Sequence, residues 1–405
     1  MRILFVTDFL PHEQSDQGGA KVIDWYMREV RARGNEVSLL ALCQPKDAPF
    51  ANEVSGRWAN TRVIRVGHTP ARRIRSVLGA MFQTSARSYC LSAGMPRHAA
   101  KLLCSHDFDL IHIFHPSLIR IVSDALPRAR RPRTRLIGDV HDVSTVVLRR
   151  KIRAQPTIRG LLDLYWATRS EYVDYALADG LLVYSDVDAA DLARHVRSKV
   201  PMHRLKMWFD AIGNVRSGIG VRALGRELLV VGTSADPRMR AGAEWLLDRV
   251  WPSVVARFPD AILRLVSVRP EHMAKWASVS GVVPLPYCDD LIDLYDRSAA
   301  LLFPLRSGGF TRHLKLLNAM ARGCPIVLTP EANTSEQLVD GVEAAVCATP
   351  EAFVESITRL FLDSSYGASL AAAALRHVQG EYRGIDIIGD LLTAYEHNGQ
   401  AEYIP

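Results

Sequence analysis

Short apolar runs alternate with amphipathic stretches along the whole chain, and this alternation restricts the possible folds more than any other feature. In the first half the expected strands are Arg2–Thr7, Glu36–Leu42, Leu110–Phe114, Arg135–Asp139 and Gly180–Tyr184. A helical pattern over Lys21–Arg33 ends at Gly34, and further helical patterns separate the later strands. Strands that alternate with helices predict βαβ units and therefore a parallel, doubly wound α/β sheet.

The second half begins the same pattern again. Its expected strands are Glu227–Gly232, Ala261–Ser267, Ala300–Pro304 and Pro325–Thr329. Its expected helices are Ala241–Arg257, Leu291–Ser298, His313–Arg322 and Pro350–Leu362. A chain of 405 residues is too long for one ordinary core. We therefore predict two domains, 1–210 and 225–380, joined by a Gly-rich polar linker, and a C-terminal segment, 381–405, whose helix crosses back to the first domain.

The composition is that of a soluble globular protein, with 48% apolar and 23% charged residues. No apolar stretch approaches the roughly 18 residues of a membrane span. The apolar N-terminus carries Asp8 and Pro11, which favours a buried first strand over a signal peptide. Six cysteines lie far apart without a C-x-x-C pair, which is typical of free thiols in a reducing compartment. The sequence thus predicts a cytoplasmic protein.

Positive charge is concentrated in the first half. Residues 1–200 contain 30 Lys and Arg against 20 Asp and Glu, whereas the remainder contains 20 against 23. Arginines cluster at 72–75, 128–135 and 149–153. This distribution suggests an anionic partner, such as a membrane surface, a lipid phosphate or a nucleic acid. An arginine-rich surface that only contacts solvent is the alternative.

The segment from Pro304 to Gly341 carries the strongest functional pattern. Ser307, Gly308 and Gly309 follow an expected strand and precede an expected helix, so their backbone could approach a pyrophosphate closely. Lys315 lies within that helix, and its ammonium could neutralise a diphosphate as a point charge. An ordinary exposed helix lysine is the structural alternative.

This segment, PLRSGGFTRHLKLLNAMARGCPIVLTPEANTSEQLVDG, resembles the donor-binding segment of GT-B glycosyltransferases, specifically of the retaining family 4. Upstream, ADPRMRAGAEWLLDRVWPSVVARFPDAILRLV is similar to one subgroup of that family, and PEAFVESITRLFLD matches the helix after the donor site. FVTDFLPHEQSDQGGAKVI, FDLIHIFHP, GDVHD and ADGLLVYSDVD occur in the family's order. The resemblance is strong over residues 225–365 and loose before residue 200.

The resemblance implies two Rossmann-like domains facing across a cleft, an acceptor in the first domain and a nucleotide-sugar in the second. The donor contacts that it implies are Gly18, Gly19, Arg238, Gly308, Gly309, Arg312, Lys315, Asn318 and Glu336. The sequence departs from the family at Phe310 and Asn318, which replace two glutamates, the second of which holds the ribose hydroxyls. Asn318 can still exchange hydrogen bonds with a ribose, and Glu336 matches a downstream glutamate.

His141 and Asp142 follow an expected strand and are the catalytic candidates. By resemblance His141 lies near the transferred sugar and Asp142 on the acceptor side, while a capping Asp beside a packed His is the structural alternative. His112 and His115 are interpreted as structural. Asp186 and Asp188 imitate a metal-binding Asp-x-Asp pair, but they also open a helix that Ser185 or Asp186 would cap. No metal or redox cofactor is expected.

The leading hypothesis is metal-independent, retaining transfer of a hexose from a nucleotide-sugar to a glycan or lipid-linked glycan during polysaccharide biosynthesis. The basic first half adds a possible peripheral contact with the anionic inner face of the plasma membrane. A non-catalytic GT-B subunit that binds a partner transferase or glycan is a second hypothesis, motivated by Phe310 and Asn318. A DNA-modifying GT-B enzyme is a third, with nucleic acid ranked behind a glycan as partner.

Overall fold

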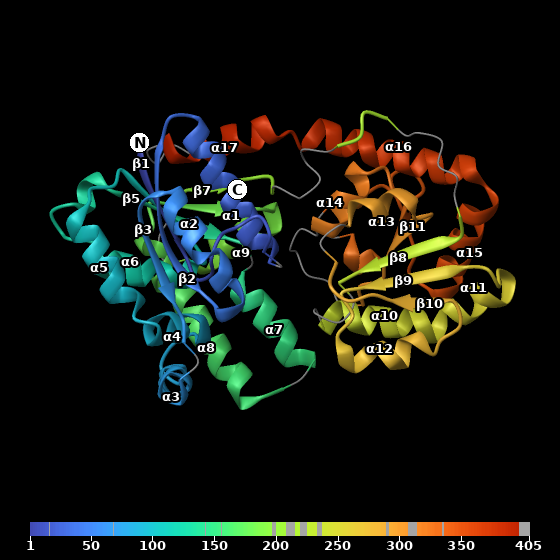
Figure 1. The fold of residues 1–405 in the computed structure, drawn as a ribbon, viewed down its shortest axis with the longest axis horizontal. Coiled ribbons are helices and arrows are strands. Elements are labelled where there is room, and N and C mark those ends of the chain that lie inside the picture. The colour runs from blue at the N-terminus through green and yellow to red at the C-terminus, as the bar shows by residue number, and fades with distance from the viewer. Residues whose placement is uncertain are drawn as a thin grey trace. The chain divides into compact units, whose positions relative to one another are not determined.

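The computed structural model of the chain divides into two compact units, one formed by 1–207 with 385–405 and the other by 208–384 (Figure 1). Each unit contains one sheet. The residues that the structure describes are 1–15, 17–67, 69–141, 143–154, 156–196, 200–207, 215–218, 225–232, 237–288, 291–306, 314–333 and 336–396.

The first unit contains a seven-stranded parallel sheet in the order β3-β2-β1-β4-β5-β6-β7. Its strands are β1 (Arg2–Thr7), β2 (Glu36–Cys43), β3 (Ala59–Arg65), β4 (Leu110–Phe114), β5 (Arg135–Val140), β6 (Gly180–Val183) and β7 (Met202–Arg204). The five expected strands are confirmed to within one residue at each end. Strands β3 and β7 lie at the two edges of the sheet, and the hydrophobic pattern did not predict them.

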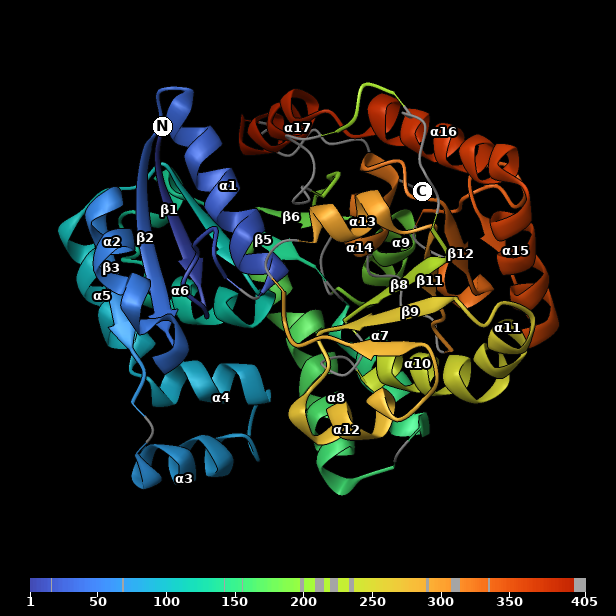
Figure 2. The same ribbon diagram turned by 45° about the vertical axis from the view of Figure 1, so that its right-hand side comes forward.

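Helices connect these strands. They are α1 (Gly18–Ala32), α2 (Ala51–Arg57), α3 (Pro70–Gly79), α4 (Ser85–Ser92), α5 (Met95–Ser105), α6 (Ile119–Ala125), α7 (Ser144–Ala154), α8 (Ile158–Val173), α9 (Asp186–His195) and, from the end of the chain, α17 (Gly384–Glu396). Helix α1 begins three residues before the expected start, so Gly18 and Gly19 form its first turn instead of a loop. Both ribbon views show α4 between α3 and the sheet (Figures 1 and 2).

The second unit contains a six-stranded parallel sheet in the order β10-β9-β8-β11-β12-β13. Its strands are β8 (Glu227–Val231), β9 (Ile262–Val266), β10 (Val282–Pro284), β11 (Ala300–Phe303), β12 (Ile326–Leu328) and β13 (Ala345–Val346). Its helices are α10 (Pro237–Arg249), α11 (Trp251–Arg257), α12 (Pro270–Ala277), α13 (Ile292–Arg297), α14 (Leu314–Ala321), α15 (Pro350–Leu362) and α16 (Ser364–Glu381).

The prediction of one helix over Ala241–Arg257 is wrong, because two helices, α10 and α11, occupy this segment. The break falls at Val250, two residues before Pro252. A proline lacks the N–H that would continue the helical ladder, and its ring clashes with the carbonyl four residues earlier. The same property makes Pro252 suitable for the first turn of α11.

Part of the expected linker belongs to the second unit. The Arg216 N–H donates to the Ala321 carbonyl at 3.0 Å, and the Gln379 side-chain amide donates to the Arg216 carbonyl at 2.6 Å. These bonds attach the described stretch 215–218 to α14 and α16. The second unit accordingly begins at Trp208 and not near residue 225.

None of the helices in the described part of the chain combines the length and the apolar character that crossing a bilayer requires.

Candidate functional site

A buried carboxylate, Asp139, lies near the carboxyl end of β5 in the first unit. His112 Nε2 is 3.1 Å from Asp139 Oδ2, and the Tyr184 hydroxyl donates to the same oxygen at 3.0 Å. His141 Nε2 lies 3.2 Å from Asp139 Oδ1, at an ion-pair distance but without the alignment of a hydrogen bond. Burial by itself raises the pKa of Asp139, but His141 and His112 outweigh it and lower that pKa below its ordinary value. The carboxylate is therefore ionised.

An ionised carboxylate only accepts hydrogen bonds, and this property assigns the tautomer of His112. Its Nε2 therefore carries a proton toward Asp139, and its Nδ1 lies 2.6 Å from the Tyr395 hydroxyl, which is the donor of this second bond. Burial and the nearby Asp139 charge raise the pKa of Tyr395 well above its ordinary value, which keeps this hydroxyl protonated. Tyr395 belongs to α17, so the C-terminal helix ends against the same network.

His141 is the member of this network that reaches the surface. Its side chain is 20% exposed, whereas those of His112 and Asp139 are fully buried. Its ring lies between Phe114 and Tyr184, with centroid distances of 4.3 and 4.6 Å. The imidazole is thus held in place by two rings and a carboxylate at the carboxyl edge of the sheet.

The diglycine at the start of α1 has a packing role beside this histidine. A Cβ at Gly19 would lie 3.0 Å from the Phe114 ring, the same ring that packs on His141. The structure thus brings Gly19 and His141, two residues singled out from the sequence, against one side chain, while Gly18 occupies the same first turn. Asp142 lies outside the described residues.

Three residues of this network were not recognised as site residues from the sequence: Asp139, Tyr184 and Tyr395. The signal for Asp139 was available, because a charged residue within an otherwise apolar buried strand requires partners. His112 was interpreted as structural, and its buried hydrogen bonds agree with that interpretation while linking it to His141 through Asp139. Tyr395 is separated from His112 by 283 residues, so no local pattern could reveal it.

In the second unit, Lys315 reaches the carboxyl end of β8. It is the second residue of α14, and a Cβ built on Gly232 would come 2.0 Å from its Nζ. Gly232 has φ +82°, a left-handed conformation that favours glycine. The residue after β8 must therefore be small both for its backbone and for the lysine side chain that lies over it.

The loop that follows β11 is anchored at its start. A Cβ at Gly242 would meet the Pro304 carbonyl oxygen at 2.0 Å, so α10 packs on this loop without an intervening side chain. The Thr329 hydroxyl donates to the Leu305 carbonyl at 2.5 Å. The Arg306 guanidinium lies 4.8 Å from the centre of the Trp245 ring, a cation–π contact. Beyond Arg306, the expected donor residues Gly308, Gly309 and Arg312 lie outside the described part of the chain.

The other donor candidates lie near Lys315 in sequence or in the same sheet. Asn318 is buried and follows Lys315 by three residues on α14, which places both on one side of the helix. Arg238 is half-buried in the first turn of α10, the helix after β8. Glu336 is not a surface residue, because it is buried and its Oε2 accepts a 2.7 Å hydrogen bond from Tyr382.

The Asp-x-Asp pair in the first unit is engaged with protein partners. Asp186 forms an ion pair with Arg204 at 3.0 Å. Asp188 is buried and accepts a 2.6 Å hydrogen bond from Ser185, whose hydroxyl in turn accepts from the Asp188 N–H. This is the N-cap of α9, in agreement with the structural interpretation of these acids.

We predict that Tyr395→Phe loosens α17 from the first unit. Removal of the hydroxyl leaves the buried His112 Nδ1 without its donor, which should lower the free energy of unfolding by about 1–2 kcal/mol. Hydrogen exchange of the α17 amides should accelerate. Tyr172→Phe, which removes a hydroxyl from a 49% exposed side chain on α8, is the control. Unchanged α17 exchange in Tyr395→Phe would contradict the assignment of this bond.

Comparisons with known proteins show which family the second unit matches and which fold the chain has. Residues 225–363 match the family described as glycosyl transferases group 1. No curated protein matches the chain. Among solved structures, sucrose-phosphate synthase from Thermosynechococcus elongatus aligns at 15% identity and a TM-score of 0.69, with 98% of each chain covered.

Two further structures share this fold over nearly the whole chain. WaaG, a glycosyltransferase involved in lipopolysaccharide biosynthesis, aligns at 16% identity and a TM-score of 0.65, with 97% of this chain and 98% of that one covered. Anabaena HepE in complex with UDP and glucose aligns at 14% and 0.62, with 97% and 99% covered. Residues 225–363 of the second unit therefore form a glycosyl transferases group 1 domain, and the chain as a whole has the GT-B fold of these solved glycosyltransferases.

Proposed function

We propose that the chain transfers a hexose from a nucleotide-sugar to a glycan or lipid-linked glycan, with retention of configuration and without a metal ion. The position of Lys315 over Gly232 is the observation that carries this proposal. It places an ammonium group at the carboxyl end of β8, where parallel α/β sheets bind their ligands. A nucleoside diphosphate leaving group gains negative charge as the glycosidic bond breaks, so a fixed cation there would act in the transition state.

The first unit supplies the groups proposed for the sugar side. His141 is oriented by Asp139 and two aromatic rings, and its partly exposed ring can hydrogen-bond a sugar hydroxyl. We propose that it contacts the transferred hexose and that Asp142 lies on the acceptor side. In the second unit, we propose that Asn318 contacts the ribose and that Arg238 contacts phosphate. Glu336, which the Tyr382 hydroxyl holds in place, is proposed to lie beside the donor.

The proton NMR signal of the product's anomeric centre tests retention.

The names of the similar structures guide the choice of donor and acceptor. HepE was solved with UDP and glucose, and WaaG is involved in lipopolysaccharide biosynthesis. By analogy we propose a uridine diphosphate sugar as the first donor to test and a cell-surface glycan as the acceptor class.

We predict that Lys315→Ala and Gly232→Ala both weaken UDP binding. Loss of one charge-assisted contact should cost about 1.5–3 kcal/mol, which is roughly tenfold to a hundredfold in affinity. Gly232→Ala should have a similar effect, because its methyl group would occupy the position of the ammonium. Isothermal titration calorimetry with UDP measures both effects.

Gly341→Ala is the matched control for Gly232→Ala. Gly341 also has a positive φ, +71°, but a Cβ there meets nothing within 4 Å. Both substitutions therefore impose a similar backbone strain, and only one displaces Lys315. Equal UDP affinity in Gly232→Ala, Lys315→Ala and the wild type would refute the donor site, whereas UDP binding without any transfer would favour a non-catalytic subunit.

We also predict that turnover is the same in excess EDTA as in added Mn²⁺. Arg204 and Ser185 already bind the two carboxylates that most resemble a metal pair, Asp186 and Asp188, and Lys315 offers the positive charge that a cation would otherwise supply. Transfer assays with and without chelator measure this. Activity that EDTA abolishes, Mn²⁺ restores and Asp186→Asn removes would overturn the proposal.

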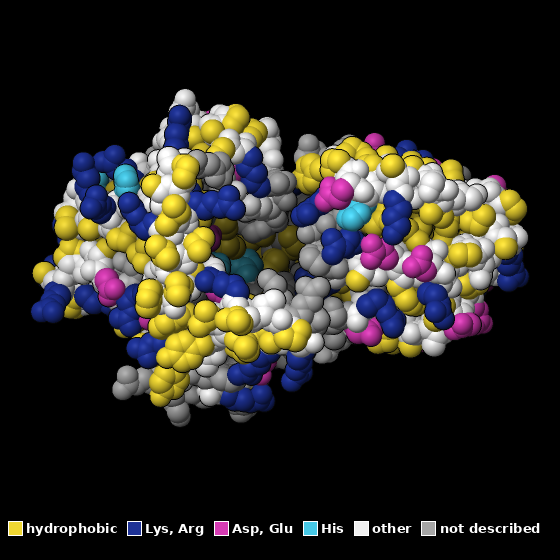
Figure 3. All heavy atoms as spheres, turned by 90° about the horizontal axis from the view of Figure 1, so that it is seen from below, with side chains coloured by type: hydrophobic (Ala, Val, Ile, Leu, Met, Phe, Trp, Pro, Cys, Tyr) yellow, Lys and Arg dark blue, Asp and Glu magenta, His cyan; other side chains and the backbone are white. Residues whose placement is uncertain are grey.

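We further propose peripheral contact between α3 and an anionic membrane. None of the residues of α3 is buried, and large apolar side chains project from it and from the loop that follows. These are Ile74, Val77, Leu78, Met81 and Phe82, each more than half exposed. Figure 3 shows hydrophobic side chains gathered on one face of the first unit with Lys and Arg beside them. Apolar residues flanked by arginines are typical of helices that lie in the membrane interface.

The arginines expected at this surface do not all face outward. Arg73 and Arg75 are exposed, whereas Arg72 is half-buried, donates to the Gly67 carbonyl at 3.1 Å and lies 4.5 Å from the centre of the Tyr89 ring. Arg72 therefore stabilises the α3–α4 pair. Arg149 on α7 is also exposed, and the side chains of Arg150 and Lys151 lie outside the described part.

We predict that Arg73→Glu/Arg75→Glu weakens flotation with vesicles of phosphatidylcholine and phosphatidylglycerol. Each arginine near an anionic surface contributes on the order of 1 kcal/mol, so the double reversal should lower binding by at least about tenfold. Arg62→Glu/Arg97→Glu makes the same change in net charge at two exposed positions on β3 and α5. Equal losses in the two double variants would show that net charge, and not α3, determines binding.

A further inference from the structure

Two adjoining pockets lie beside the segment that follows α3 in the first unit, and neither includes a residue of the Asp139 network or of the Lys315 site. The first has a volume of about 220 Å³ and lies between the segment after α3, α4, α6 and α8. The second has a volume of about 310 Å³ and lies between α4, α7, α8 and the turn after β4. Thr84 and Ser170 line both pockets, so the two adjoin at these residues.

The smaller pocket is lined by three arginines: Arg87, Arg120 and Arg169. One buried carboxylate, that of Asp174, holds the first two in place, with Arg87 Nη1 at 3.0 Å and Arg120 Nε at 2.9 Å. Ser170 adds a 2.9 Å hydrogen bond to the same carboxylate. The lining residues thus carry three positive charges against one negative charge.

Two of these guanidinium groups are pre-organised, which is the arrangement that favours binding of a phosphate. An arginine presents several N–H groups in a planar fork, and Asp174 uses only part of that capacity on Arg87 and Arg120. Arg169 is exposed, and no carboxylate partner for it occurs among the described residues. Arg120 also forms a 3.7 Å ion pair with Asp124, which does not line the pocket, so the three arginines face two carboxylates and keep an excess of positive charge. A bound phosphate would balance this excess without displacing Asp174.

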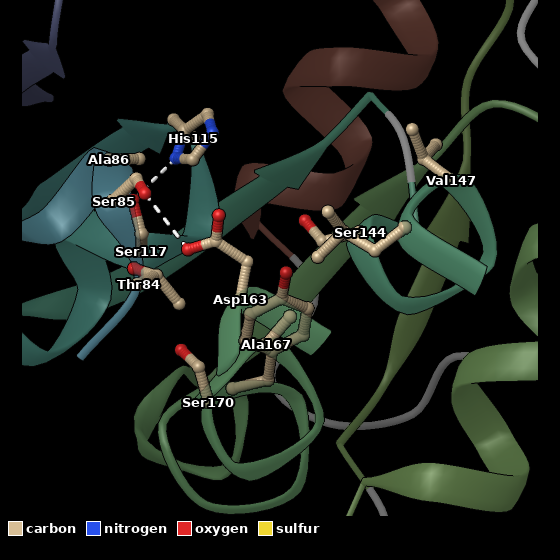
Figure 4. A pocket seen from close by; sticks show the side chains of 12 residues that line it. Thr84, Ser85, Ala86, His115, Ser117, Ser144, Val147, Asp163, Ala167 and Ser170 are labelled. Atoms are coloured by element: carbon tan, nitrogen blue, oxygen red, sulfur yellow. Dashed lines mark hydrogen bonds between the residues drawn. The ribbon is translucent and has the colours of Figure 1, made fainter. Parts of the chain in front are cut away.

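The larger pocket has a different chemical character. Its lining carries hydroxyl groups from Thr84, Ser85, Ser117, Ser144, Ser170 and Tyr175. Figure 4 shows Ser85 and Ser117 on one side of this pocket and Ser144 on the other, with Asp163 between them. Asp163 accepts from Ser85 at 2.8 Å, and His115 Nδ1 lies 2.5 Å from the Ser117 hydroxyl. Groups that can both donate and accept hydrogen bonds suit a polyhydroxylated ligand such as a sugar.

Apolar side chains continue from the arginine pocket onto the surface. Phe82 lines this pocket and is 72% exposed, and it follows the apolar residues of α3. On α8, Ile158, Leu161 and Tyr165 are 82%, 55% and 59% exposed. The Trp166 indole donates to the Met81 carbonyl at 3.0 Å, which fixes the segment after α3 against α8. The arginine pocket therefore shares Thr84 and Ser170 with the hydroxyl-lined pocket and presents the exposed Phe82 at its opening.

We propose that these two pockets bind the head group of a lipid-linked acceptor, with its phosphate at Arg87, Arg120 and Arg169 and its first sugar among the hydroxyl groups. The lipid chain lies on the apolar surface of α3 and α8. The role as acceptor rests on the proposed function, whereas binding of a lipid phosphate does not depend on it. Residues of the first unit alone form the whole site.

The test compares two vesicle compositions of equal surface charge. Phosphatidylinositol presents a phosphodiester followed by a polyhydroxylated ring, as the proposed head group does, whereas phosphatidylglycerol presents the same phosphodiester with only a glycerol cap. We expect the wild-type chain to bind phosphatidylinositol vesicles more tightly than phosphatidylglycerol vesicles, because the ring can enter the hydroxyl-lined pocket once the arginines hold the phosphate. Arg87→Gln/Arg169→Ala should remove this preference and lower phosphatidylinositol binding by at least tenfold, at about fivefold per arginine.

Arg97→Ala/Arg62→Ala is the control, because it removes the same charge from exposed positions outside both pockets and should leave the preference intact. Equal preference in Arg87→Gln/Arg169→Ala and the wild type would overturn the proposal, as would the absence of any preference in the wild type. Glucose 1-phosphate provides the soluble arm. If it binds in calorimetry with the same dependence on Arg87 and Arg169 while vesicles show none, the ligand is a free sugar phosphate and the lipid assignment is wrong.

UDP affinity measured in the same variants separates the two proposals. We expect it to be unchanged in Arg87→Gln/Arg169→Ala, because neither residue is in the second unit. A wild-type chain that fails to bind UDP but prefers phosphatidylinositol would refute the proposed function and leave the lipid site in place. The opposite result would retain the donor site and remove the lipid site.

Discussion

An ionised carboxylate without exposed surface, that of Asp139, determines the arrangement of the first unit around β4 and β5. Burial of a charge is costly unless hydrogen bonds and opposite charges compensate for it. Here the compensation comes from His112, His141 and Tyr184, which lie on or directly after three adjacent strands. The need to satisfy one charge therefore fixes the orientation of the partly exposed histidine.

The same requirement extends to the end of the chain. His112 donates a hydrogen bond to Asp139 through its protonated Nε2. Its other ring nitrogen, Nδ1, is buried and is paired with the hydroxyl of Tyr395 on α17. Polar groups buried in series polarise one another, so each bond of such a network depends on the next. The last helix therefore influences His141 indirectly, through His112 and Asp139.

A second buried carboxylate, that of Asp174, has arginines as its partners. It holds two of them and neutralises only one of their two charges, so positive charge remains in a fixed position. At the carboxyl end of β8, Gly232 leaves room for the Lys315 side chain, and its left-handed backbone conformation favours glycine over a larger residue. Pre-organised cations of both kinds suit phosphate groups, as the proposed donor site and the proposed lipid site both require.

The sequence by itself determined the two-sheet α/β fold, because the alternation of strands and helices is a local property of the chain and most expected strands were confirmed within a residue. It also singled out His141, which follows an expected strand, and Lys315, whose helix comes after the loop at the end of another expected strand. In such sheets ligands bind at the carboxyl ends of the strands. Only the tertiary structure decided that Arg72 packs on Tyr89, that Glu336 is buried against Tyr382, and that Asp139, His112 and Tyr395 form one network. These contacts join residues that are far apart in the sequence or depend on which face a side chain occupies. No local pattern encodes them, because their energy depends on the burial and charge that folding itself creates.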